Sequence, residues 1–299
     1  MKHIENMLFV LAVFVLAAGC IKEDLDDCWN VSLYFQYLAD GDKDVLAQYV
    51  NKVDLYVYNE RDELVGQESY NQDELINFQA TPHFRLEPGR YRVVTVGNAY
   101  GQTAVVNEES GDYDHIYIQH PNWGYDEPVT GHDHNYIGDC YFEIGADKLV
   151  RDTVTMESAH INVEVEIKGL NLNTKAVEGY TLVFENSNAQ TSFENEVNPG
   201  AQGNCYPELF YDEATGLVKT QDLALFRLDD RCEHVMKLVE DATGKELATV
   251  DVDQFIADND LEAEMAKSEA TLRIGIEFTQ LGVTIKIPDW EIVDVKPEF

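Results

Sequence analysis

Four histidines and four aspartates lie close together in the middle of the chain, and both residue types can bind metal ions. They are Asp112, Asp114, His115, His120, Asp126, His132, Asp133 and His134. Their spacing matches no known metal site. The Gly, Pro and Asn residues between them predict a loop. We therefore interpret the His115–His134 region as a polar loop and assign no metal and no cofactor.

Other patterns that would carry chemistry are incomplete or missing. Asp40, Asp42 and Asp44 resemble the opening of a calcium-binding loop, but Val45 stands where that loop needs Gly and Asn51 where it needs Glu. The sequence has no Gly-x-Ser-x-Gly, phosphate-binding loop, dinucleotide fingerprint or His-Glu-x-x-His motif. We assign no catalytic residue and predict that the chain is not an enzyme.

The chain is rich in tyrosine, and several aromatic residues fall in one region. This local group comprises Tyr113, Tyr117, Trp123, Tyr125, Tyr136 and Tyr141. Aromatic rings on an exposed sheet could stack on sugar rings. Packing across strands and within the core is the commoner role, and we favour it.

Cys20 stands where covalent modification by lipid is expected. A weakly basic start at Lys2 is followed by an apolar run over residues 7–18, which is too short to cross a membrane and is typical of a secretory signal peptide. Ala17-Ala18-Gly19-Cys20 resembles a lipobox, whose cysteine receives acyl chains such as palmitate, although Ala17 replaces the usual Leu. The alternative is an ordinary signal peptide that ends near a cysteine. We predict a lipoprotein signal peptide over residues 1–19 and lipidation at Cys20.

Residues 20–27 form an acidic linker after this cysteine. Ile21 in the second mature position differs from the Asp of an inner-membrane retention signal. Lys22-Glu23-Asp24 resembles the short charged tag that sends some lipoproteins to the outer face of the outer membrane, and a solvated acidic linker explains it equally well. The predicted location is the outer membrane, with a lipid anchor and exposure at the cell surface.

Acylation of Cys20 would leave four cysteines for disulfide bonds. An exported chain meets an oxidising compartment, so bridges can form there. Four cysteines allow three connectivities, and the sequence does not choose between them. We predict that Cys28 pairs with Cys140 and Cys205 with Cys232, because each bridge then stays inside one predicted domain.

The charge of the chain is strongly negative. It has 56 acidic and 21 basic residues, for a net charge of −35. Phosphate contacts need clustered Lys and Arg, so the composition argues against a nucleic-acid partner. It also argues against direct electrostatic binding to anionic lipid.

Hydrophobic residues alternate with polar ones in both halves of the chain, which predicts half-buried antiparallel strands. The clearest runs are residues 31–37, 53–58, 91–96, 161–167, 272–278 and 283–287. Helix is scarce, with one or two short turns expected in residues 253–267. We predict an all-β chain of two β-sandwiches, residues 28–152 and 153–299, joined near Arg151-Asp152.

Four segments taken in order resemble one family of proteins. The first is the lipobox cysteine with its acidic stretch up to Asp27-Cys28 and the strand from Val31 to Tyr37. The others are the motifs GRYRVVTVGN at residues 89–98, TMESAHINV at 155–163 and IKIPDWE at 285–291. In order and spacing they resemble the minor anchor lipoproteins of type V (fimbrillin-type) pili.

The resemblance covers nearly the whole mature chain and implies a fold and a role. It implies two tandem transthyretin-like β-sandwiches with little helix. It also implies a non-enzymatic anchor at the base of a fimbria, tethered to the outer membrane through acylated Cys20, which limits fimbrial length. Its partners would be fimbrial stalk or accessory pilin subunits, joined by β-strand exchange. The alternatives are a surface glycan-binding lipoprotein of a nutrient-uptake system and a metal-dependent envelope enzyme.

Replacing the predicted lipid attachment site tests the anchor directly. We expect Cys20→Ser to abolish membrane attachment and to leave the fold intact, because acyl chains contribute about 0.8 kcal/mol per buried CH₂ and the serine carries none. Fractionation of cells that lack pilin partners measures the effect. Retention of the variant in the outer membrane would contradict the prediction.

Overall fold

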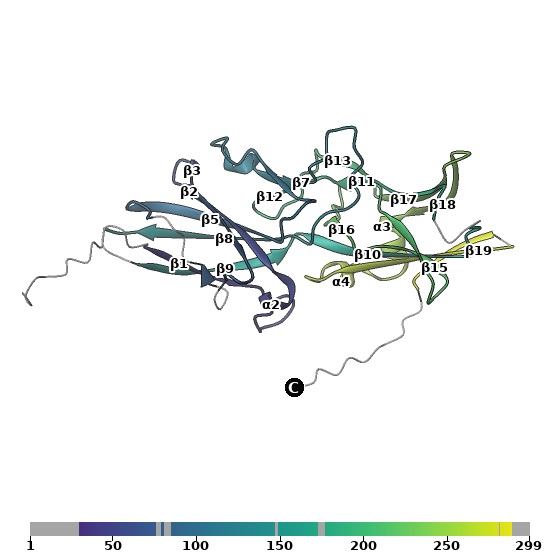
Figure 1. The fold of residues 1–299 in the computed structure, drawn as a ribbon, viewed down its shortest axis with the longest axis horizontal. Coiled ribbons are helices and arrows are strands. Elements are labelled where there is room, and N and C mark those ends of the chain that lie inside the picture. The colour runs from purple at the N-terminus through teal and green to yellow at the C-terminus, as the bar shows by residue number, and fades with distance from the viewer. Residues whose placement is uncertain are drawn as a thin grey trace, which may run out of the picture.

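The computed structural model describes residues 30–75, 79–80, 85–146, 149–172, 177–280 and 282–288. Most of its elements are strands, and Figure 1 shows them in two blocks placed end to end along the long axis. The prediction of an all-β chain with two β-sandwich units and little helix is confirmed. In the part of the chain that is described, no helix has the length and apolar character needed to cross a membrane.

The N-terminal block is built on one seven-stranded sheet. Its strand order is β3-β2-β5-β8-β9-β1-β4. The strands are β1 (Val31–Gln36), β2 (Lys52–Asn59), β3 (Leu64–Asn71), β4 (Gln79–Ala80), β5 (Gly89–Gly97), β8 (Tyr136–Ile144) and β9 (Val150–Ser158). A single helical turn, α2 (Leu46–Tyr49), joins β1 to β2. Neighbours are antiparallel except β1 and β9, which run parallel.

Both faces of this sheet are buried. One face carries a core from β1, β2, β5 and β9 that includes Leu33, Leu55 and Val154. The other face, with Tyr56 and Val94, is covered by a small three-stranded sheet and by Phe193. This small sheet has the order β12-β7-β6 and comprises β6 (Ala104–Val106), β7 (Tyr117–Gln119) and β12 (Gln190–Ser192), with the 3₁₀ turn η2 (Tyr113–His115) before β7.

The C-terminal block is a sandwich of two sheets. One has the order β14-β15-β10-β19-β20 with β16 also paired to β10, and the other has the order β13-β11-β17-β18. Their apolar faces enclose one core, to which the alternating residues of β10 and β19 contribute Ile161, Val163, Leu272 and Ile274. The strands are β10 (His160–Lys168), β11 (Tyr180–Asn188), β13 (Gln202–Cys205), β14 (Leu209–Asp212), β15 (Leu217–Thr220), β16 (Leu223–Phe226), β17 (Val235–Glu240), β18 (Lys245–Asp251), β19 (Thr271–Thr279) and β20 (Gly282–Lys286).

Two short helices lie where the sequence predicts helical turns. They are α3 (Val252–Asp258) and α4 (Glu262–Met265). Asp251 begins α3 because its carboxylate accepts a hydrogen bond from the backbone N–H of Gln254, which caps the helix. Phe255 and Ile256 are buried in the C-terminal core.

The passage between the blocks lies at Ala159, not at the predicted boundary after Asp152. Residues 150–155 pair with β1 and residues 155–158 with β8, so the predicted boundary falls inside β9. Arg151 is exposed and Asp152 partly exposed on this strand, while Val154 and Met156 point into the core. The charged pair resembles a linker in the sequence because it faces solvent. Ala159 alone separates β9 from β10.

Gly138 allows the closest approach between β8 and β9. The ladder between these two strands covers Tyr136–Asp139, whereas the ladder between β8 and β5 continues to Ile144. A Cβ atom on Gly138 would lie 2.5 Å from the carbonyl oxygen of Thr155 and 3.0 Å from the Cα of Met156. Both are backbone atoms of β9, so they cannot move aside without displacing the strand.

We expect Gly138→Ala to destabilise the protein, by about 1–3 kcal/mol for overpacking of a buried site. Gly101→Ala is the matched control, because a Cβ atom there would meet nothing within 4 Å. Urea unfolding followed by tryptophan fluorescence measures both midpoints. Equal midpoints for the two variants would contradict the close approach seen at Gly138.

Candidate functional site

The loop of residues 120–135, which connects β7 to β8, lies where the two blocks meet. It contains His120, His132 and His134 of the predicted polar loop. Its outward part contacts the C-terminal sandwich, because Val129 forms a parallel bridge with Cys205 and His132 an antiparallel bridge with Ala224. We treat this junction as the candidate site, because both halves of the chain contribute to it.

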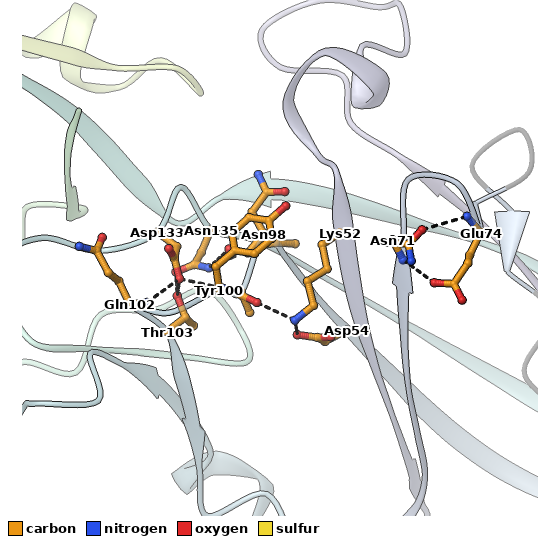
Figure 2. A network of polar contacts seen from close by, with 12 residues as sticks. Lys52, Asp54, Asn71, Glu74, Asn98, Tyr100, Gln102, Thr103, Asp133 and Asn135 are labelled. Atoms are coloured by element: carbon orange, nitrogen blue, oxygen red, sulfur yellow. Dashed lines mark hydrogen bonds and ion pairs between the residues drawn. The ribbon is translucent and has the colours of Figure 1, made fainter. Parts of the chain in front are cut away.

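Asp133 attaches the inner end of this loop to the segment after β5 (Figure 2). Its carboxylate accepts hydrogen bonds from the backbone N–H groups of Tyr100 at 2.8 Å and Gln102 at 3.1 Å, and from the hydroxyl of Thr103 at 2.8 Å. Three bonds to one carboxylate hold the loop in a single position. Asp133 therefore has a structural role that fully uses one of its oxygens.

Two asparagines extend this network toward the N-terminal core. The amide of Asn135 donates to the carbonyls of Gly97 and Asn98, each at 3.3 Å, and Asn135 is fully buried. The amide of Asn98 donates to the carbonyls of Tyr49 and His134. Buried side-chain amides in such positions donate hydrogen bonds to backbone carbonyls that would otherwise be buried without a partner.

A second set of contacts joins the blocks on the other side of Ala159. Arg227 follows β16, and its guanidinium donates to the backbone carbonyls of Ser158 at 2.9 Å and Ser268 at 2.8 Å. The hydroxyls of Tyr37 and Tyr136 both donate to the carboxylate of Glu269. The two sandwiches are therefore fixed to one another by a cationic and an anionic side chain.

The predicted histidine region does not converge on one point. His115 is exposed on η2 and pairs with Asp112 at 2.9 Å. His132 stacks on Phe226 with ring centres 3.9 Å apart, and His134 packs edge-on against His160 at 4.8 Å. Among the described residues no group of three or more His, Cys, Asp or Glu side chains is arranged to hold a metal ion.

His160 was not predicted as a site residue, yet it is 1 % exposed and lies at the junction. Its Nδ1–H donates to the carbonyl of Asn135 at 3.0 Å. Its Nε2 is buried and has no hydrogen-bond partner within the described part of the chain. A proton on Nε2 would create a buried donor without an acceptor, so the neutral ring is favoured.

Burial keeps two of these histidines neutral. It lowers the pKa of His132 from 6.5 to about 3, and the neighbouring His120 and His160 add to the effect. It also lowers the pKa of His160 to about 3, with further contributions from His134 and Arg227. An imidazole with such neighbours resists protonation in the folded state.

Cys205 and Cys232 are not joined, which contradicts the predicted pair. Cys205 points into the C-terminal core, whereas the sulfur of Cys232 contacts the side chains of Gln202 and Asn188. Gln202 and Cys205 lie three positions apart on β13, and an odd separation places side chains on opposite faces of a strand. Cys232 therefore reaches the wrong face of β13 for a bridge to Cys205.

Of the remaining predicted cysteines, Cys140 alone lies within the described residues. Cys140 is a free thiol on β8, and burial raises its pKa to about 12. Its predicted partner Cys28 lies outside the described residues, as does the lipidation site Cys20 with the segments 1–19 and 20–27. Lipidation at Cys20 stays a prediction.

The predicted aromatic group divides between core and surface. Tyr113 and Tyr136 are buried, as the packing interpretation expects. Tyr141 is 65 % exposed and lies over the guanidinium of Arg92, with 4.8 Å from Arg92 Cζ to the ring centre. Trp123 and Tyr125 line a hollow beside the junction loop, together with Tyr206 of the C-terminal half. The sequence gives no sign that Tyr206 belongs to this group.

Acid should destabilise the folded protein through His132. The unfolded chain takes up a proton there as the pH falls below 6.5, whereas the folded chain does so only near pH 3. The contribution of His132 to the free energy of unfolding is therefore fully present above pH 6.5. Below pH 6.5 it decreases by at most about 1.4 kcal/mol for each pH unit.

We expect His132→Phe, which can keep the stack on Phe226, to lose less stability than the wild type between pH 7 and pH 5. His115→Phe is the matched control at an exposed site and should keep the acid response. Urea midpoints at several pH values measure all three proteins. Parallel loss of stability in the wild type and His132→Phe would show that other groups cause the acid response.

Comparison with known proteins shows the family and the fold. The family model described as fimbrillin-A associated anchor proteins Mfa1 and Mfa2 matches residues 25–296. No curated protein sequence matches the chain.

Several solved structures of bacterial proteins share the fold. A suspected polysaccharide-binding protein of Bacteroides thetaiotaomicron has a TM-score of 0.66 at 15 % identity, over 87 % of this chain and 96 % of the other. A suspected adhesin of Bacteroides ovatus has a TM-score of 0.66 at 16 % identity, over 87 % and 94 %. The fimbrial anchor protein Mfa2 of Porphyromonas gingivalis has a TM-score of 0.63 at 13 % identity, over 87 % and 97 %.

At these identities the structures establish the fold, and the family model, which spans most of the chain, establishes the family. The two sandwiches in tandem and the family match over residues 25–296 agree with one another. This chain belongs to the family of fimbrillin-A associated anchor proteins, structural accessory proteins of cell-surface fimbriae.

Proposed function

We propose that this protein is the anchor subunit at the base of a fimbria. Acylated Cys20 tethers it to the outer membrane, and one of its sheet edges receives a strand of the adjoining pilin subunit. By ending the fibre at the membrane it also limits fimbrial length. The observation that carries the proposal is that residue 30, where the described chain begins, and β20, an outer strand among the described elements, lie at opposite ends of the described structure.

Strand direction places the N-terminal end of the described chain far from the C-terminal sandwich. Val31 pairs in parallel with Val150, and β9 then runs eight residues further to Ser158 at the junction. At about 3.3 Å per residue, Val31 lies roughly 26 Å from the junction. Cys20 precedes residue 30 by ten positions in the sequence, and the proposal assigns the lipid anchor to this end.

The opposite end of the molecule carries β20. Strands β10 and β19 run parallel and away from the junction, and β19 turns into β20 at the far end (Figure 1). Within the described residues β20 pairs with β19 and forms the outer edge of its sheet. Its residues Val283 and Thr284 are exposed. Such an edge is competent to pair with a strand from another chain.

The junction between the two ends is suited to carry a pulling force. Strands β9 and β10 follow one another through Ala159, so the backbone crosses from one sandwich to the other without a flexible linker. Strand β12 of the second half pairs with β7 of the first half at three positions. Arg227 and Glu269 add bonds across the same boundary. Force applied at β20 would be transmitted to the N-terminal end through these contacts.

Loss of the protein should separate fimbriae from cells. We expect a deletion strain to release fimbriae longer than normal into the medium, because attachment and length control are both lost. Complementation with the wild-type gene should restore short, cell-bound fimbriae, and electron microscopy with sedimentation of the medium measures both. Normal, cell-bound fimbriae in the deletion strain would contradict the anchor proposal.

Site-directed photo-cross-linking tests which edge receives the pilin strand. A photoreactive amino acid in place of Thr284 on β20 should cross-link to a pilin subunit in intact cells. The matched control is the same replacement at Thr249, an exposed threonine on β18, the edge of the opposite sheet. Cross-linking from Thr249 and not from Thr284 would move the junction to the other sheet and contradict the role of β20.

A further inference from the structure

A hollow of about 640 Å³ lies beside the junction, between residues 122–129 of the loop and strand β13. The loop belongs to the N-terminal half of the chain and β13 to the C-terminal half, so neither half forms the hollow alone. Its volume is within the range of small-molecule sites, and such sites often lie between domains. The anchor role described above makes no use of it.

Three aromatic residues line this hollow. Tyr125 is 77 % exposed and Tyr206 38 % exposed. Trp123 lies over Gly203, where an added Cβ atom would be 3.3 Å from the indole Nε1. Single exposed aromatic residues are common on protein surfaces, but several that share one concave surface mark an interaction site. Their flat apolar faces can receive a flat apolar face of a ligand.

The polar side chains that line the hollow disfavour a negatively charged ligand. Asp126, Glu127 and Asn204 line it and offer carboxylate and amide groups to hydroxyl or amide donors. None of the described residues that line the hollow is Lys, Arg or His. With a net charge of −35 on the chain, an anionic ligand would be repelled.

The wall of the hollow is held in place before any ligand binds. The backbone N–H of Asn122 donates to Nδ1 of His120 at 3.0 Å, and its side-chain amide donates to the carbonyl of Pro128 at 2.9 Å. The N–H of Tyr206 donates to the carbonyl of Val129 at 2.7 Å. A fixed wall reduces the ordering cost of binding.

We propose that this hollow binds a neutral saccharide. The apolar faces of pyranose rings would stack on Tyr125 and Tyr206, while their hydroxyl groups would donate to the carboxylates of Asp126 and Glu127 and to the side-chain carbonyl of Asn204. An extended peptide fits less well, because Val129 of the loop already pairs with the edge of β13 at Cys205. The proposal does not depend on the anchor role, since the hollow lies at the junction and not on β20.

Isothermal titration of the purified mature chain with defined tetrasaccharides tests the proposal. The neutral probes are maltotetraose, cellotetraose, mannotetraose and chitotetraose, and tetragalacturonate is the anionic probe. We expect at least one neutral probe to bind with a Kd below about 1 mM and tetragalacturonate to bind more weakly. Tyr125→Ala and Tyr206→Ala should each weaken that binding about tenfold through loss of stacking.

Tyr141→Ala is the matched control, because Tyr141 is also an exposed tyrosine but lies on β8, outside the hollow. It should bind the same probe as the wild type does. The proposal is overturned if no neutral probe binds at concentrations up to about 10 mM. It is equally overturned if Tyr125→Ala and Tyr206→Ala bind normally, or if tetragalacturonate binds best. Binding of a pilin-strand peptide that Tyr125→Ala abolishes would assign the hollow to a protein partner instead.

Discussion

The arrangement of the two sandwiches depends on the guanidinium of Arg227. It donates to the carbonyl that ends β9, at Ser158, and to the carbonyls of Lys267 and Ser268 just before β19. Ser158 is the last residue of β9, whereas Lys267 and Ser268 lie in the segment between α4 and β19. The planar guanidinium satisfies several of these carbonyls in one fixed geometry. Arg227 therefore joins the end of β9 in the N-terminal block to the segment that leads into β19 in the C-terminal sandwich.

The cation of Arg227 also contributes to the low pKa of His160, one of the two histidines that burial keeps neutral. Burial is the main cause of the low pKa of His160, and the positive charges of His134, when protonated, and Arg227 oppose a further charge there. His132 is shielded from solvent by its stack on Phe226, the residue before Arg227. A junction that contains the cation of Arg227 is therefore most stable when its imidazoles are uncharged. The stability of the contact between the two sandwiches consequently depends on pH.

Hydrophobic alternation predicted the fold class well and the connections between strands poorly. Residues 161–167 and 272–278 form β10 and β19 as expected, because each strand has one buried and one exposed face. Their parallel pairing to one another, and that of β1 to β9, joins segments far apart in the chain that no turn motif marks. The predicted boundary after Asp152 failed for the same reason, since only the pairing of β9 with β8 and β1 shows that this strand belongs to the first sheet. The pair Cys205–Cys232 failed because sequence separation does not reveal which face of β13 a side chain occupies.

The candidate site was predictable in composition but not in geometry. The polar loop and the aromatic group containing Trp123 and Tyr125 are visible in the sequence, whereas Tyr206 and Arg227 come from strands that only the fold brings to the junction. The loop is fixed at its inner end by Asp133 and at its outer end by Val129. Residues 122–128 between these two points are largely exposed and contribute little to either core. Their side chains can therefore change without loss of the fold, which is the condition under which a rigid scaffold acquires a binding surface.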